Sequence, residues 1–171
     1  MAKAKGRLAS ALSAGAVAIV ANTLALKAAD FVPLATAKGG LLRLIRPWLA
    51  PLLKSAGISR AWSAAGAPAV NTPLFQTGFH LAVGLLMALV YAYVLEPRMS
   101  GGPWRKGLVY AAVVWLLNAA VVLPLTGEGF AGSAHLTMAG MVWFAAAHTL
   151  FFVLLAVLYA GQPKSSKRAR R

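Results

Sequence analysis

Four polar side chains interrupt otherwise apolar stretches of this chain and are the residues best suited to chemistry: Asn22, His80, Asn118 and His148. If these stretches cross a membrane, a polar group in them costs free energy unless it finds a partner, so it marks a packing contact or a working site. An imidazole can bind a metal or move a proton, whereas an amide only donates and accepts hydrogen bonds. All four residues fall near the middle or outer half of their stretches, and we expect one intramembrane polar cluster.

Three interpretations of this cluster are open. In the first, the histidines and asparagines only hydrogen-bond across helices, each bond being worth about 0.6 kcal/mol on average in a membrane bundle. In the second, His80 and His148 are the axial ligands of a b-type haem held between two helices. In the third, the cluster lines a path for protons or a small solute, which makes the chain a transporter or channel. Haem b enters only through the second interpretation.

Other residues offer little to an enzyme. The three carboxylates, Asp30, Glu96 and Glu128, fall in separate segments, so no pair is placed for general acid–base catalysis. His135 follows Glu128 closely, but one histidine and one glutamate do not make a metal site. The chain has no cysteine, which excludes disulfides, thiolate metal sites and iron–sulfur clusters. We therefore expect no enzymatic activity and no bound metal.

The composition is typical of a membrane protein. Of the 171 residues, 60% are hydrophobic and 12% are charged, whereas a soluble domain carries about 25% charged residues. The charges crowd together and leave four long uncharged windows, at 8–26, 61–95, 107–127 and 129–163. About 20 helical residues cross the hydrocarbon core, so each window is predicted to hold one spanning helix. The sequence predicts an all-α fold, an integral membrane four-helix bundle.

Proline, glycine and capping residues set the limits of these helices. Thr72 and Pro73 announce a helix start, His135 is a candidate to cap or begin the last helix, and Pro124 is expected to end the third. The transmembrane domain is predicted over 1–163, with helices at about 8–28, 73–95, 104–122 and 136–160. We expect the first helix to remain in the protein rather than to be cleaved as a signal peptide, because its apolar stretch is longer than the usual signal core.

Small residues recur at every fourth position on two of these helices. The stripes are Ser10, Ala14, Ala18 and Asn22 on the first helix, and His80, Gly84, Ala88 and Ala92 on the second. Small side chains let membrane helices approach closely, so these faces are predicted to be buried against neighbours. Because the chain has little mass outside the membrane and no set of residues arranged for catalysis, we interpret it as a small multi-pass membrane protein. It is expected to pack through such faces into a homo-oligomer or a larger membrane assembly.

The first loop has a pattern of its own at about 41–56. Its basic residues share one helical face: Arg43, Arg46 and Lys54. Apolar side chains fall mostly opposite, which is typical of an amphipathic helix lying in the membrane interface. Because Pro47 and Pro51 interrupt the pattern, we expect two short helical pieces rather than one rod, with an irregular loop over the bundle as the alternative.

Basic residues also indicate orientation and partners. With four crossings, eleven of the 17 Lys and Arg fall on the side of the termini, which predicts that both termini are cytoplasmic. Contacts with anionic lipid headgroups are predicted for the first loop and for the basic tail, 164–171. The residues are Arg43, Arg46, Lys54, Lys164, Lys167, Arg168, Arg170 and Arg171. The pI of 11.3 would also suit nucleic acid, but the membrane context favours lipid, so we expect no nucleic-acid partner.

Between His80 and about Tyr159 the aromatic, proline and glycine residues stand in a distinctive order. A histidine-led helix ends in Tyr91-Ala92 and Glu96-Pro97, followed by Trp104 with Gly107, Trp115, Pro124-Leu125 with Gly127, and Trp143 with His148. This order resembles the YagU-like family of small bacterial inner-membrane proteins. The resemblance leaves out the first helix and the first loop. It implies a protein of the bacterial plasma membrane and carries over no catalytic residue.

Overall fold

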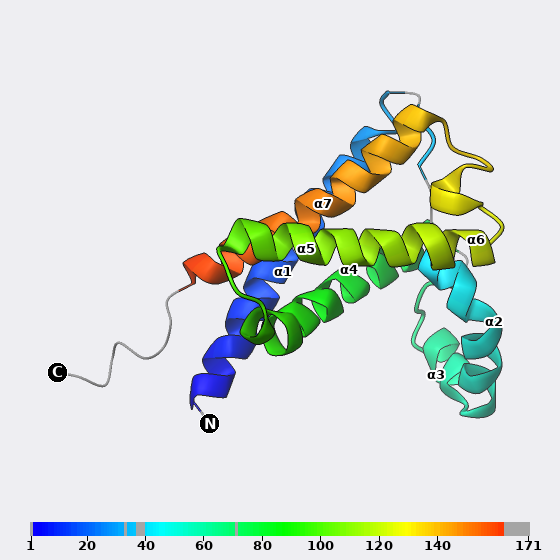
Figure 1. The fold of residues 1–171 in the computed structure, drawn as a ribbon. Coiled ribbons are helices and arrows are strands. Elements are labelled where there is room, and N and C mark those ends of the chain that lie inside the picture. Colours follow the sequence, from blue (N-terminus) through cyan, green and yellow to red (C-terminus); the bar gives the residue numbers. More distant parts are fainter. Residues whose placement is uncertain (1, 33, 37–39, 71, 163–171) are drawn as a thin grey trace.

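The computed structural model describes residues 2–32, 34–36, 40–70 and 72–162 of the chain. These residues form helices, turns and loops and contain no strand. Four segments are long and apolar enough to cross a membrane: Gly6–Ala28, Pro73–Arg98, Pro103–Leu125 and Met138–Gly161. The chain is therefore an all-α membrane protein, as its composition predicts (Figure 1). The predicted basic tail, 164–171, lies outside the described residues.

The second spanning segment begins at the predicted residue, Pro73, whereas the first begins at Ala2 rather than at about residue 8. Helix α1 covers Ala2–Ala28, and α4 covers Pro73–Val90 before a π-helical turn, η1, at Tyr91–Leu95 and a 3-10 turn, η2, at Glu96–Arg98. At the start of α4 the Thr72 hydroxyl accepts a hydrogen bond from the Phe75 N–H at 3.3 Å. Pro73 occupies the first turn, where its missing N–H costs nothing.

The last two spanning segments differ from the sequence-based expectation at the ends that the loop between them joins. Helix α5 covers Pro103–Leu117 and continues through a π-helical turn, η3, at Asn118–Val122 into α6 at Leu123–Leu125. Pro124 therefore does not end the helix, because the wider π-helical turn before it relieves the clash with the preceding turn. Helix α7 covers Met138–Gly161 and is capped by Thr137, whose hydroxyl accepts from the Gly140 N–H at 3.1 Å. His135 precedes this cap and neither caps nor begins the helix.

The first loop contains one continuous helix, α2, at Gly40–Ser55, and a short helix, α3, at Ile58–Ala64. The prediction of two pieces separated by the prolines was wrong, as was the alternative of an irregular loop. Pro47 and Pro51 lie one turn apart on one face and remove the backbone bonds to the carbonyls of Arg43 and Pro47. All these residues are exposed, so the freed carbonyls can bond to water and the helix continues.

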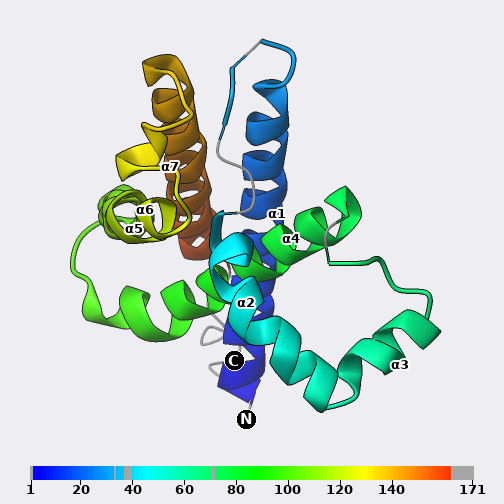
Figure 2. The ribbon, with the colours of Figure 1, turned by 90° about the vertical axis from the view of Figure 1, so that its right-hand side faces the viewer.

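The spanning helices pack around α1 and α7. Helix α1 contacts α4 on one side and α7 on the other, and α5 packs on the far side of α7 (Figure 2). Small residues permit these contacts: a Cβ on Gly107 would lie 2.7 Å from the Cα of Val153, and one on Gly15 would lie 2.5 Å from the Cβ of Ala88. The Trp143 indole donates to the Ala25 carbonyl at 2.9 Å and joins α7 to α1.

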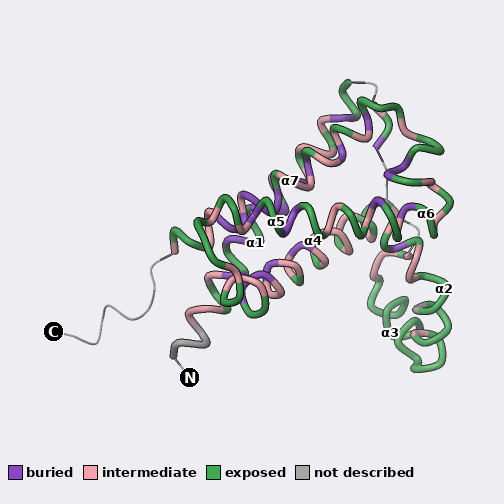
Figure 3. Tube along the Cα trace, in the orientation of Figure 1, coloured by how far each residue is buried: buried purple, intermediate pink, exposed green. Residues whose placement is uncertain are grey.

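The buried core lies at the middle of α1 and in the second half of α7. It consists of Ala14, Ala18, Ile19, Ala88, Tyr91, Tyr110, Ala111, Phe151, Phe152, Leu155 and Ala156. Toward the opposite end, the pair formed by α1 and α7 diverges from α4 and α5 (Figures 1 and 2). Figure 3 shows that buried positions gather where the helices cross, whereas α3 and the second half of α2 are almost wholly exposed.

Candidate functional site

Asn22 is the centre of the polar contacts inside the bundle. Its side chain is 1% exposed on the inner face of α1. The amide nitrogen donates to the carbonyl of Ala147 in α7 at 2.7 Å, and the amide oxygen accepts from Nε2 of His80 in α4 at 2.8 Å. The oxygen can only accept, so the proton of His80 lies on Nε2 and its Nδ1 carries the lone pair. One side chain thereby joins three spanning helices.

The other two predicted members of the cluster do not share these bonds. His148 lies within electrostatic range of His80, but its Nδ1–H donates at 2.8 Å to the carbonyl of Phe144, one turn earlier in α7. Its ring also lies against the Phe144 ring, with centroids 4.3 Å apart. Asn118 is half-buried on η3, and within the described part of the chain none of the cluster's hydrogen bonds reaches it.

This geometry constrains the haem interpretation. Nε2 of His148 carries the lone pair, whereas Nε2 of His80 is engaged by Asn22. Histidine ligation of haem by His80 would therefore use Nδ1 or break the bond to Asn22. The described residues contain no group of three or more His, Cys, Asp or Glu side chains arranged to hold a metal ion.

The geometry also bears on the interpretation as a polar path. Beyond His80, toward the end of α4, the interior is filled by aromatic rings: Tyr91 lies 6.1 Å from Tyr110 and 5.7 Å from Tyr159, between ring centroids. Phe152 packs on Tyr110 with centroids 4.4 Å apart, and the hydroxyl of Tyr110 donates to the backbone carbonyl of Met87. Among the described residues, aromatic rings therefore separate the contact of Asn22 with His80 from the end of the α4 segment.

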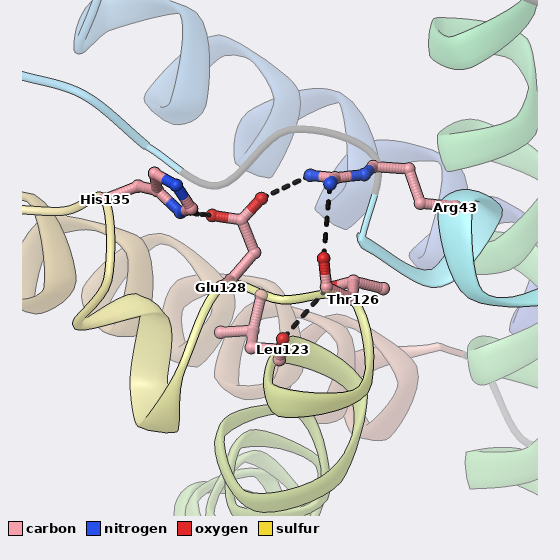
Figure 4. Close-up of polar contacts among 5 residues, drawn as sticks. All are labelled: Arg43, Leu123, Thr126, Glu128 and His135. Carbon is pink, nitrogen blue, oxygen red and sulfur yellow. Dashed lines mark hydrogen bonds and ion pairs between the residues drawn. The ribbon is translucent and has the colours of Figure 1, made fainter.

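A second polar cluster lies outside the bundle, at the end where α2 begins (Figure 4). The carboxylate of Glu128 accepts from Nη1 of Arg43 on one oxygen and from Nδ1 of His135, at 2.9 Å, on the other. Nη2 of Arg43 also donates to the backbone carbonyl of Thr126 at 3.2 Å. The Glu128 side chain is only 12% exposed, so this ion pair is better shielded than an ordinary surface pair.

Two glycines explain how Glu128 reaches this position. Gly127 and Gly129 have φ angles of 81° and 72°, a region that favours glycine because it carries no Cβ. The chain consequently turns sharply on each side of Glu128, whose backbone N–H donates to the carbonyl of Leu123 at 2.9 Å. The loop before α7 is thus built to present one carboxylate to α2.

Sequence reasoning assigned Arg43 to lipid headgroups and did not foresee this pair. The available signal was charge: Glu128 is one of three acidic residues in a chain with a net charge of +14, and it stands in a loop on the same predicted side as the basic first loop. Of the other residues predicted to contact lipid, Arg46 and Lys54 are exposed on α2. Lys164, Lys167, Arg168, Arg170 and Arg171 lie outside the described residues.

Comparison of the chain with models of protein families, with curated proteins and with solved structures finds no match in any of the three.

Proposed function

We propose that this chain is a non-catalytic membrane subunit that packs through the first half of α4 into a homo-oligomer or a larger membrane assembly. The observation that carries the proposal is the exposed pair Gly78 and Ala82, one turn apart on α4. A Cβ on Gly78 would meet nothing within 4 Å. Small residues at this spacing let a second membrane helix approach closely.

The two small-residue stripes predicted from the sequence are not available for this role, because their inner residues are already occupied. Ala14 and Ala18 of α1, together with Ala88 and Ala92 of the α4 segment, are buried inside the chain. They serve the fold of one protomer and leave no surface for a neighbour.

We also propose that the chain lies in the inner membrane of a bacterium with both termini in the cytoplasm. The excess of Lys and Arg on the side of the termini favours cytoplasmic termini, and the YagU-like order of residues favours the inner membrane of a bacterium. The ion pair between Arg43 and Glu128 supports the four-crossing topology, because it requires the first and third loops to lie on the same side. Which side this is can be measured with a membrane-impermeant maleimide on single-cysteine variants, since the chain has no native cysteine.

The test of assembly is a cross-link at the proposed interface. Ala82→Cys in native membranes should form a disulfide-linked dimer on mild oxidation, whereas Ala112→Cys, exposed on α5, should not. Gly78→Leu combined with Ala82→Leu should reduce the stoichiometry measured by light scattering in detergent, whereas Ala112→Leu should leave it unchanged. A wild-type protein that is strictly monomeric and carries no other chain would overturn the proposal. Unchanged stoichiometry in the double variant would overturn the assignment to α4.

A further inference from the structure

The segment formed by α2 and α3 extends away from the bundle. Figure 1 shows α2 running crosswise to α4 and α5, at the end of the bundle opposite the buried core. Figure 2 shows α3 extending to one side of the bundle. The segment is held at two places. Arg43 binds Glu128 near its start, and the Trp62 ring packs edge-on against Phe75 of α4 near its end, with centroids 6.0 Å apart.

Large apolar side chains on this segment are left uncovered by the rest of the chain. Trp48 is 77% exposed and Leu52 is 65% exposed, one turn apart on the same face of α2. Ile58 is 49% exposed on α3, and Trp62, one turn later, is 43% exposed beside its contact with Phe75. Exposed apolar side chains of this kind on a helix that lies crosswise to membrane-spanning helices fit burial in the boundary between headgroups and acyl chains.

The opposite face of α2 is basic. Arg46 and Lys54 are exposed there, Arg60 is exposed on α3, and the sequence from 40 to 70 contains no acidic residue. Arg43 lies on the same face but is neutralised by Glu128. A shallow hollow of about 400 Å³, lined by Arg43, Arg46, Pro47 and Ala50, offers space for a phosphate group beside Arg46.

We propose that the α2–α3 segment is a binding surface for anionic lipid. Trp48, Leu52, Ile58 and Trp62 enter the acyl boundary, while Arg46, Lys54 and Arg60 bind headgroup phosphates. The ion pair between Arg43 and Glu128 fixes the segment against the loop before α7. The basic residues of the segment therefore have two roles. Arg43 binds another part of the protein, and the other basic residues bind lipid.

The first test measures depth in the bilayer. The full chain is placed in nanodiscs as single-cysteine variants carrying an environment-sensitive fluorophore, at Leu52→Cys on the apolar face and at Ala50→Cys on the basic face. The label at 52 should be quenched by lipids with a spin label high on the acyl chain, and the label at 50 should be quenched by aqueous iodide. Equal access of iodide to both labels would overturn the proposal.

The second test measures lipid selectivity. Bound phosphatidylglycerol relative to phosphatidylcholine is quantified by mass spectrometry of the protein from nanodiscs containing both lipids. Removing Arg46 and Lys54 together, as R46A/K54A, should reduce this ratio by up to about 25-fold, because each basic residue near an anionic surface is worth about a fivefold preference and the two factors multiply. The control R98A/R105A removes two charges from the short loop and helix start on the opposite side, and it should leave lipid bound to the α2–α3 segment unchanged. Fluorescence transfer from labelled phosphatidylglycerol to the label at 50 distinguishes the two sides, and an equal loss in both variants would overturn the assignment.

Discussion

Helix α4 carries the same small-residue spacing twice, with opposite results. Gly84 and Ala88 are buried, and a Cβ on Gly84 would lie 2.8 Å from the Cβ of Ile19 in α1. Gly78 and Ala82 are exposed, and no residue of the range 73–83 is buried. The first half of α4 is joined to the bundle by the bond from His80 to Asn22, and to α3 by the contact of Phe75 with Trp62.

The two pairs show that small residues permit close packing of helices, but they do not determine which helix packs against them. In the second half of α4, the partner is α1 of the same chain, because the two helices cross there. In the first half, α1 has turned away with α7, and the same spacing faces outward. The residue that marks the boundary is His80, whose polar contact replaces the close packing of the following turns.

The largest expected difference between the two halves comes from a bulky side chain at each glycine. Gly84→Leu must displace Ile19 and separate α4 from α1, so we expect a loss of unfolding free energy of about 3 kcal/mol or more. Gly78→Leu enters open space and removes a glycine from a helix interior, so the protomer should be unchanged or gain about 0.5–1 kcal/mol. Unfolding in mixed SDS micelles, followed by circular dichroism, compares the two. Equal destabilisation would show that the first half of α4 is packed within the protomer.

Most of the helical architecture could be predicted from the sequence, because it depends on local signals. The uncharged windows locate the spanning helices, and Thr72 with Pro73 locates the start of α4. The continuation of α2 through Pro47 and of α5 through Pro124 could not be predicted in the same way. In α2 the helix continues because the freed carbonyls reach solvent, and in α5 because a π-helical turn relieves the strain. Both conditions depend on surroundings that are distant in sequence.

The candidate site was predictable in its composition but less so in its pairing. Hydropathy alone identifies Asn22, His80 and His148 as polar groups in apolar helices. The hydrogen bond that joins Asn22 to His80, and its absence between His148 and Asn118, depends on where four helices cross and on their rotation. The pairing of Arg43 with Glu128 connects positions 85 residues apart, and a single sequence gives no measure of such proximity.

A smaller effect is expected at the boundary between the halves. Asn22→Leu removes both of its interhelical hydrogen bonds and leaves His80 without a partner, so the protomer should lose about 1–2 kcal/mol. Asn118→Leu, on the diverging part of α5, should change protomer stability by less than about 0.5 kcal/mol. The same SDS unfolding assay measures both variants. If Asn118→Leu cost as much as Asn22→Leu, the polar cluster would include all four predicted residues, and the boundary would not lie at His80.

The smallest expected effect tests whether the α2–α3 segment steadies the first half of α4 through Trp62 and Phe75. Arg43→Ala and Glu128→Ala each break the link that holds α2, and a double-mutant cycle should give a coupling of about 0.5–1 kcal/mol, as for a partly shielded surface pair. Amide hydrogen exchange in nanodiscs should quicken over 40–55 and 73–83 and stay unchanged over 84–92, because the second half of α4 is held by α1. The coupling should diminish in 1 M salt, since exposed Arg43 is screened by ions. Equally faster exchange along the whole of α4 would mean that its two halves open as one unit. The two halves would then differ in exposure but not in how they are anchored.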